Sequence, residues 1–335
     1  MKHPLALACV AAAVALAAGG VLPGLIGPYF LRLVIFSLIY ALLALSLNLT
    51  LGFRGELSLG HQTFFGVGAY AAAILATTYE LPLLLLLPVA AACAAIAAFG
   101  IGLIALRMRG PYFAIVTLSF GVIAQILAVN LVDLTNGPMG ISGIGAGPTS
   151  LLGFAVPWSS EVVCYGMLVV LVFLSGFVTF ALRESKFGRA WRALRDHEDL
   201  AAAIGIPDFR MDLLALVISA AMAGVAGGVY AFYTSVVAPD DVFSFSFVIA
   251  MLIPVVLGGR GTIIGPIIGA FIYAFAPEYL RIAQDWRLPI FGLLLVVLVI
   301  LAPEGLVVLA ARAPEKLRTL FRRQGTLGDG TEPNK

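Results

Sequence analysis

The polar side chains best suited to contact a small ligand gather in one otherwise apolar stretch, residues 45–70, which five glycines interrupt. Glycine-broken membrane helices expose backbone N–H groups and a positive dipole end, which suit an anionic ligand group. Polar residues at membrane depth usually face a cavity or a neighbouring helix. The stretch therefore predicts a substrate path, or else close helix packing in which His61 and Gln62 bond across the interface. The candidate path residues are Asn48, Ser58, His61, Gln62 and Thr63, with Asn136 from a later glycine-rich loop.

Motifs for common enzymatic and metal chemistry are missing from the sequence. The three histidines form no HExxH pair, and no Cys/His cluster has the spacing of metal ligands. No lysine completes a GxxxxGK[ST] phosphate loop, so we expect the chain not to hydrolyse ATP itself. The three cysteines stand far apart in apolar runs, where buried small side chains are a simpler interpretation than a disulfide. We expect no catalytic residue, no metal site and no cofactor.

Composition indicates that the chain is a membrane protein. Hydrophobic residues make up 61% and charged residues 11% of the 335 residues, whereas soluble domains have about 45–50% and about 25%. These values exclude an ordinary soluble enzyme and a basic nucleic-acid binder. Several charge-free runs are long enough to cross a bilayer as helices.

The apolar runs predict an all-α polytopic membrane protein with about ten transmembrane helices, some broken by glycine. Residues 5–26 are interpreted as a first span, although a cleaved signal peptide has a similar pattern. The pair 244–258 and 262–277 is short and predicts either two tilted helices or a re-entrant element. The predicted spans are 5–26, 33–51, 57–78, 82–106, 111–132, 161–182, 213–235, 244–258, 262–277 and 288–302.

The distribution of Lys and Arg predicts the orientation. With the N-terminus inside, ten spans place 17 basic residues on the cytosolic side and three outside, as the positive-inside rule requires. The loop 133–160 contains no Lys or Arg and is predicted to lie outside. Both termini are then cytoplasmic. We expect a membrane domain over 1–303 and a basic, partly disordered cytoplasmic tail over 304–335.

The largest predicted cytosolic loop, 183–212, contains signals for two short helices. Ser185 is expected to cap the first and Asp196 the second, which Gly205 ends. The second helix carries a small apolar run, Ala201–Ile204. Such a run indicates either a docking surface for a partner or an amphipathic helix resting on the membrane.

A short repeat links two distant parts of the chain. Gly258-Gly259-Arg260-Gly261 resembles Gly52-Phe53-Arg54-Gly55, and both segments lie on the inner side in the predicted topology. Two related halves would fit transporter architecture.

A series of short motifs over residues 45–270 resembles the branched-chain amino acid permeases of ABC importers, and most closely the M-type subunits of Liv systems. Each motif is weak alone, but their order is specific. One departure is Gln62-Thr63, where this family usually has small apolar residues. The matching residues are Leu47-Asn48-Leu49, Gly52, Gly55, Leu57–His61, Phe64–Gly66, Gly68–Tyr70, Leu106-Arg107, Arg109-Gly110, Tyr112–Ile115, Thr135–Gly137, Gly140-Ile141, Ser185, Gly188–Ala190, Arg195-Asp196, Glu198, Ala201-Ala202, Gly205-Ile206, Gly258-Gly259, Gly261-Thr262 and Gly265-Pro266.

The resemblance implies a transmembrane subunit of an ATP-driven importer in the cell (inner) membrane. It implies four kinds of partner: a second, H-type permease, two cytosolic ABC ATPase subunits, a periplasmic or extracellular substrate-binding protein, and the lipid bilayer, with no nucleic acid. The implied substrates are leucine, isoleucine and valine; urea, short amides and other amino acids stay open, and an ion-coupled secondary transporter is the alternative class. The resemblance also identifies the loop 183–212 as the coupling helix. Its implied coupling residues are Gly188, Arg189, Ala190, Arg195, Asp196, Glu198, Ala201, Ala202 and Gly205.

Overall fold

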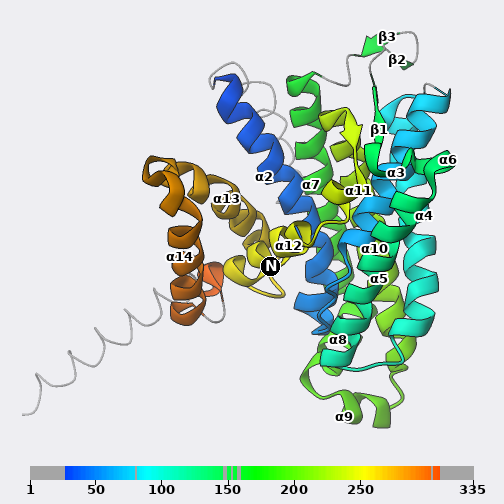
Figure 1. Cartoon of the computed structure of the whole chain (residues 1–335). Coiled ribbons are helices and arrows are strands. Elements are labelled where there is room, and N and C mark those ends of the chain that lie inside the picture. The colour runs from blue at the N-terminus through cyan, green and yellow to red at the C-terminus, as the bar shows by residue number, and fades with distance from the viewer. Residues whose placement is uncertain are drawn as a thin grey trace, which may run out of the picture.

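The computed structural model describes residues 27–79, 81–145, 149–151, 154–156, 160–302 and 305–309, and this part of the chain is predominantly helical (Figure 1). The predicted span 5–26 and almost all of the predicted tail 304–335 lie outside the described residues. The longer helices are α2 (Pro28–Asn48), α3 (Gln62–Tyr79), α4 (Leu83–Ala105), α5 (Pro111–Asn130), α7 (Glu161–Glu184), α10 (Asp208–Thr234), α12 (Phe245–Gly258), α13 (Ile264–Tyr279) and α14 (Arg287–Leu301).

Short elements connect these helices. The helical ones are the π-helix η1 (Leu49–Arg54), α6 (Val132–Thr135), the 3-10 helix η2 (Gly137–Met139), α8 (Lys186–Asp196), α9 (Glu198–Ala203), α11 (Pro239–Val242) and the 3-10 helix η3 (Leu280–Trp286). Two antiparallel ribbons complete the fold. They pair β1 (Ile141–Ser142) with β4 (Val236–Val237), and β2 (Thr149–Leu151) with β3 (Phe154–Val156).

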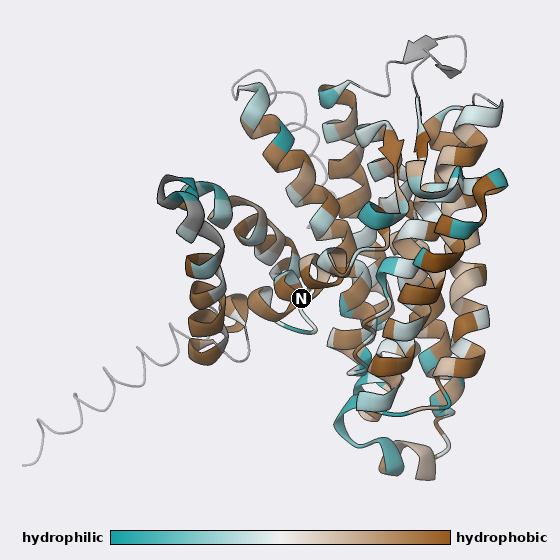
Figure 2. Cartoon of the chain, viewed as in Figure 1, coloured by the Kyte–Doolittle hydropathy of each residue, from teal (hydrophilic) through white to brown (hydrophobic). Residues whose placement is uncertain are grey.

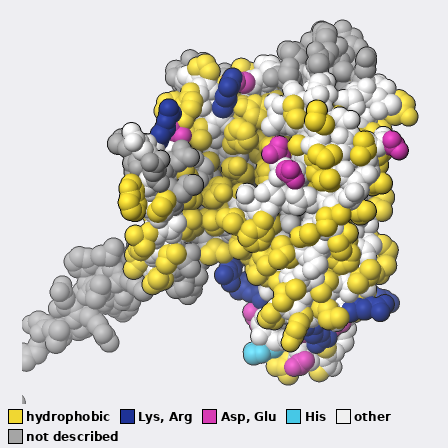
Figure 3. Space-filling model, viewed as in Figure 1, with side chains coloured by type: hydrophobic (Ala, Val, Ile, Leu, Met, Phe, Trp, Pro, Cys, Tyr) yellow, Lys and Arg dark blue, Asp and Glu magenta, His cyan; other side chains and the backbone are white. Residues whose placement is uncertain are grey.

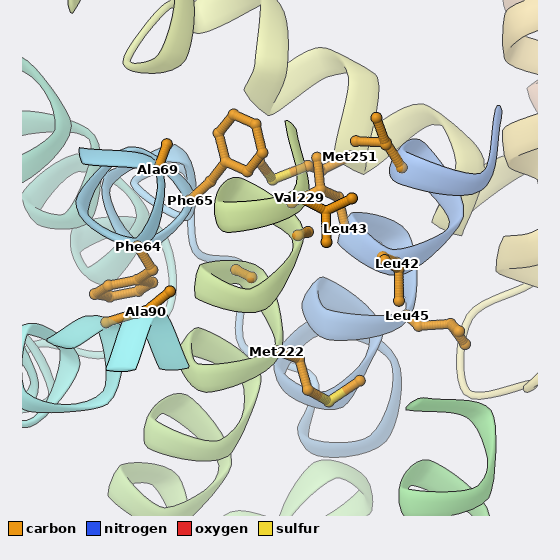
Figure 4. Packing of buried hydrophobic residues seen from close by; sticks show 14 of the residues in the cluster. Leu42, Leu43, Leu45, Phe64, Phe65, Ala69, Ala90, Met222, Val229 and Met251 are labelled. Atoms are coloured by element: carbon orange, nitrogen blue, oxygen red, sulfur yellow. The ribbon is translucent and has the colours of Figure 1, made fainter. Parts of the chain in front are cut away.

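The core lies where α10 packs against α2, α3 and α4. Glycines on α10 permit the close approach: a Cβ at Gly227 would overlap the backbone of Phe65 on α3, and one at Gly224 would meet Ala90 on α4. Small residues at helix interfaces are the usual means of tight packing in membranes. Figure 4 shows how buried side chains such as Leu42, Phe65 and Val229 fill the remaining space.

Six helical segments in the described part of the chain are long and apolar enough to cross a membrane. They agree with six of the predicted spans. The segments are Pro28–Arg54, Leu83–Ala105, Pro111–Asn130, Glu161–Glu184, Asp208–Thr234 and Pro239–Gly258. The chain is therefore a multi-pass membrane protein, and the surface of its helices is apolar between more polar ends (Figure 2).

The count of ten spans stays a prediction. Helices α3, α13 and α14 coincide with predicted spans but are not among the six. The predicted start of α3 at residue 57 is wrong, because the helix begins at Gln62. The delay has a local cause: Gly55 ends η1 with a left-handed φ of 92°, and Gly60 lies directly against the Thr117 carbonyl.

Helices α12 and α13 form a hairpin, and α13 packs on α2. With 14 and 16 residues they are about 21 and 24 Å long at 1.5 Å per residue, less than the roughly 30 Å hydrocarbon core of a bilayer. Figure 1 shows α13 and α14 standing at one side of the bundle. The structure thus gives two short helices here, joined through residues 259–263.

One end of the bundle collects the segments that were predicted to be cytosolic. Arg54 and Arg109 form ion pairs with the loop 183–212, and Arg195 of that loop reaches Gly52. At the opposite end, Arg32 pairs with Glu161 at 2.6 Å. Charged side chains flank an apolar middle on the face shown in Figure 3. These contacts bring several predicted cytosolic segments together at one end, while the alternation of all ten spans and the identity of the cytosolic side stay predictions.

The loop 183–212 contains both predicted short helices, with two corrections. Ser185 caps α8 as predicted, because its Oγ accepts hydrogen bonds from the N–H groups of Phe187 and Gly188. Asp196 does not cap α9: it is the last residue of α8, and the extended residue before α9 is His197. The predicted apolar patch is also divided between two faces.

The end of α9 at Ala203 accounts for this division, because Ile204 lies beyond the helix. Ala201 is buried at 2% exposure, on the side of α9 that contacts α8 and α10. Ile204 follows the helix and is 77% exposed. Gly205, with a φ of 87°, ends the segment as predicted.

Candidate functional site: a buried polar cluster and a charged joint

Four of the predicted path residues lie together where the chain enters α3. Ser58, His61, Gln62 and Thr63 are each no more than 3% exposed. Each has a side-chain atom without a hydrogen-bond partner in the described structure: Ser58 Oγ, His61 Nδ1, Gln62 Oε1 and Thr63 Oγ1. Such a group typically costs about 1–3 kcal/mol, and most buried polar groups in proteins are paired. We name these four residues the polar cluster.

The hydrogen bonds of His61 indicate what its free nitrogen offers. Ser46 donates its hydroxyl proton to the Leu43 carbonyl (2.7 Å), so its oxygen accepts from His61 Nε2, 3.1 Å away. This network assigns the hydrogen to Nε2 and leaves Nδ1 as an acceptor. The cluster therefore presents two free acceptors, His61 Nδ1 and Gln62 Oε1, beside two free hydroxyl groups.

Helix α5 covers the polar cluster. Gly121 faces it so closely that a Cβ there would overlap the amide of Gln62. The Leu59 N–H donates to Thr117 Oγ1 at 3.1 Å. The rest of α5 carries many exposed apolar side chains, among them Tyr112 at 70% and Ile115 at 59%. These are available to lipid or to another subunit.

A further polar group lies along the same two helices toward the opposite end. Tyr70 is 6% exposed, its hydroxyl has no partner in the described structure, and its ring stacks on Phe243 with centroids 6.0 Å apart. Tyr70 follows Thr63 by seven residues and so shares its helix face. Beyond it, Gln125 of α5 donates to Asp240 at 2.9 Å. Tyr70 was missed from the sequence, although the seven-residue spacing could have indicated it.

The other two predicted path residues are held elsewhere. Asn48 is buried, but it donates to the Thr262 carbonyl (2.7 Å) and accepts from the Gly261 N–H (2.9 Å). Asn136 is exposed in a left-handed conformation beyond the end of α5, where it donates to the Gly140 carbonyl at 2.8 Å. The structure does not bring Asn136 to the polar cluster.

Asn48 instead joins the two segments of the short repeat, residues 52–55 and 258–261, which we call the glycine segments. A Cβ at Gly52 would overlap both Asn48 and the backbone of Gly261. The segments that resemble each other in sequence thus meet in space at the end of the bundle that contains α8 and α9. Arg195 bonds to the Gly52 carbonyl at the same place.

A network of charges surrounds the place where the two glycine segments meet, which we call the joint. The side chain of Arg54 is only 4% exposed and bonds both carboxylate oxygens of Asp212, one of them at 3.0 Å. It also pairs with Glu198 of α9 at 3.4 Å. Arg109, which is 62% exposed, pairs with Glu198 at 3.5 Å and with Asp208 at 2.7 Å. The network links η1, α9, α10 and the segment between α4 and α5.

Glu56, the only acid near the polar stretch, lies beside this network. Burial raises the pKa of its carboxyl above the ordinary value, and the Arg54 guanidinium opposes the change. A titratable group inside the membrane would favour an ion-coupled transporter. Glu56 instead follows the end of η1, next to this charged network. Among the described residues, no group of three His, Cys, Asp or Glu is arranged to hold a metal ion.

The predicted coupling residues divide between anchoring and exposed positions. Trp191, which is not among the predicted coupling residues, donates its indole N–H to the Met211 carbonyl at 2.9 Å and anchors α8 to α10. Gly188 packs on the backbone of residues 182–183, and Arg189 donates to the Glu184 carbonyl at 3.2 Å. Ala190 is half-buried, whereas Asp196, Ala202 and Gly205 are exposed. Leu200, at 64% exposure, adds to the exposed apolar surface near Ile204.

Comparison with known proteins identifies the family. Residues 29–303 match the family described as the permease component of branched-chain amino acid transport systems. The LivM permease protein of Escherichia coli K12 is 37% identical over 289 residues, which cover 81% of this chain and 68% of that protein.

More distant relatives belong to the same kind of system. The LivH permease protein of Salmonella typhimurium is 26% identical over 286 residues, covering 80% of this chain and 90% of that protein. BraD of Pseudomonas aeruginosa is 27% identical over 255 residues, with coverage of 72% and 81%. No solved structure matches. These relatives confirm the resemblance found in the motifs, and they are transport subunits, not enzymes. The chain therefore belongs to the branched-chain amino acid ABC permease family, as a permease of the M type.

Proposed function

We propose that this chain is a transmembrane subunit of an ATP-driven importer in the inner membrane, and that it carries leucine, isoleucine or valine received from an extracytoplasmic binding protein. In this proposal it pairs with an H-type permease, and the pair docks two cytosolic ABC ATPases. The observation that supports it most is the polar cluster. Four unpaired polar groups sit inside an apolar helical bundle of a permease family member.

The cluster has the chemistry to bind the backbone of an amino acid. The free acceptors His61 Nδ1 and Gln62 Oε1 suit an ammonium group. The hydroxyls of Ser58 and Thr63 lie beside the N-terminal end of α3, whose dipole favours a carboxylate. Apolar side chains next to the cluster, such as Phe64, would accommodate an aliphatic side chain. In this proposal the substrate passes between α3 and α5.

The exposed apolar residues Leu200 and Ile204 are proposed to contact an ATPase subunit. Both lie at the end of the bundle where the basic residues gather, and an exposed apolar surface flanked by charges suits a protein partner. Ala201, by contrast, faces α8 and α10 and supports the shape of this surface from within.

Reconstitution of the complete complex tests the substrate and the energy source together. Vesicles containing both permeases and both ATPases, supplied with binding protein and internal ATP, are expected to accumulate labelled leucine. Excess isoleucine or valine should compete, and urea or acetamide should not. Competition by urea or amides would support the related-substrate alternative, which the Gln62-Thr63 departure leaves open. Uptake driven by an ion gradient without ATP would contradict the proposal.

Thiol labelling tests the proposed orientation. After removal of the native cysteines, single cysteines would replace Ala202 at the proposed cytosolic end and Met139, 82% exposed, at the other. An impermeant reagent added to intact cells should label only the cysteine at position 139. Labelling of position 202 with protection of 139 would invert the topology.

A further inference from the structure

We propose that the π-helix η1 is the lever that transmits movement of the docked ATPase into the membrane helices, with Arg195 as its positioning residue. This inference rests on the proposed function and adds the internal route of coupling. Residues Leu49–Arg54 form η1, which contains most of the first glycine segment and lies between the helices α8 and α9 and the second glycine segment.

The geometry of η1 makes it suited to move. It continues α2 without a break, but with π-helical hydrogen bonding, and it ends at the left-handed Gly55. Single π-helical turns inside longer helices are rare and often occur at functional sites. All six residues of η1 are nevertheless buried, so a movement of this segment must displace its neighbours.

Arg195 connects α8 to η1 and to the segment between α12 and α13. Its guanidinium donates to the Gly52 carbonyl. A Cβ on Gly55 would lie 2.9 Å from its Cγ, and a Cβ on Gly261 would lie 3.1 Å from its Nη1. One side chain of the cytosolic loop thus lies against both glycine segments. Substituting either glycine would push directly on it.

Arg54 provides a second attachment at the end of η1. Its buried guanidinium bonds Asp212 of α10 and Glu198 of α9. Separating a buried charge from its partner is strongly unfavourable, so α9, α10 and the end of η1 should move as a unit. At the start of η1, Asn48 fastens α2 to Gly261 and Thr262. Displacement of α8 and α9 therefore reaches α2, α10 and the α12–α13 hairpin at one place.

The polar cluster lies within reach of this movement. Ser46, which bonds His61, is two residues before Asn48 on α2, and Ser58 follows η1 by only four residues. A shift of η1 must therefore alter the positions of the groups proposed to bind substrate. This gives ATP hydrolysis a physical route to the substrate path.

The decisive variant is Arg195→Ala in the complete complex, with ATPase rate, leucine uptake and ATPase co-purification measured on the same vesicles. We expect uptake to fall by about tenfold or more, a size consistent with loss of a coupling contact. The ATPase subunits should still co-purify, and ATP hydrolysis should continue. Arg192→Ala is the matched control, because Arg192 is an exposed arginine on the same helix whose bonds within the described residues go to the carbonyls of Gly188 and Arg183, away from η1. It should leave both rates unchanged.

The conservative variant Arg195→Gln separates coupling from folding, because it keeps an N–H donor for Gly52 and should restore part of the uptake. Normal uptake in both Arg195 variants would contradict the proposal that η1 acts as a lever positioned by Arg195. So would a parallel loss of ATPase co-purification and uptake in both, because Arg195 would then act in docking or folding alone. Failure of the wild-type complex to show ATP-dependent uptake would instead refute the proposed function.

Discussion

Two buried polar regions lie a short distance apart along the chain, and they differ in whether their groups are paired. Around Arg54, each strong donor meets a carboxylate or a carbonyl oxygen. In the polar cluster, Ser58, His61, Gln62 and Thr63 each keep an unpaired atom. Buried polar groups that have hydrogen-bond partners fix a geometry. Buried polar groups without partners cost stability, and a bound molecule that completes their hydrogen bonds is one reason for a protein to keep them. The contrast is the basis for proposing mechanical connection in the first region and substrate contact in the second.

The largest effect should follow from breaking the paired region with Arg54→Ala. The substitution leaves Asp212, whose side chain is 12% exposed, as a buried carboxylate without its main partner. Breaking a buried pair in this way costs about 3–5 kcal/mol. We expect little folded protein in the membrane, and early unfolding in detergent measured by a thermal shift. Arg109→Ala is the control, since its exposed pairs are worth only about 0–1 kcal/mol. Equal stability of the two variants would refute the distinction between a buried and an exposed network.

Ile204→Glu should act on docking without affecting folding. Its side chain is 77% exposed, so the free chain loses no packing, but a charge placed in an apolar interface without a partner costs about 2–5 kcal/mol. We expect normal membrane levels with loss of ATPase co-purification and uptake together. Ala201→Glu makes a useful comparison, because it would place the charge inside the chain and reduce folding as well. Full ATPase binding by Ile204→Glu would instead favour a helix lying on the membrane surface.

Gly60, which packs against α5, and Gly121, which is part of α5, should respond differently to substitution by alanine. A Cβ on Gly60 would overlap the backbone carbonyl of Thr117, which cannot move without shifting α5, so overpacking should cost about 1–3 kcal/mol. A Cβ on Gly121 would overlap the side-chain amide of Gln62, which can rotate away, and would lie at ordinary contact distance, 3.6 Å, from Thr63 Oγ1. We expect Gly60→Ala to lower the melting temperature, and Gly121→Ala to lower leucine uptake with little loss of stability. Similar stability in the two variants would mean that α5 is held loosely at both positions.

The sequence indicated the polar cluster because its residues stand out in an apolar background, and that signal is local. The contacts of Arg54 were out of reach, because its partners Glu198 and Asp212 lie 144 and 158 residues further along the chain. The burial of Ala201 depends in the same way on where α9 packs. The capping role expected for Asp196 failed because α8 continues to that residue. Local composition thus indicated where buried polar residues gather, but it could not indicate what those residues contact.

The smallest effect on stability, and the sharpest test of the unpaired region, should come from Thr63→Val. Valine keeps the size and branching of threonine but removes the hydroxyl, which has no hydrogen-bond partner in the described structure. Because an unpaired buried hydroxyl is unfavourable, removing it should leave the melting temperature unchanged or raise stability by about 1 kcal/mol. Leucine uptake should fall nonetheless, because the hydroxyl is proposed to contact the substrate. Thr50→Val is the matched control: Thr50 is equally buried, but its hydroxyl donates to the Leu47 carbonyl at 3.0 Å, so that substitution should lose stability. Unchanged uptake in Thr63→Val, together with a gain in stability, would return this residue to helix packing and remove it from the substrate path.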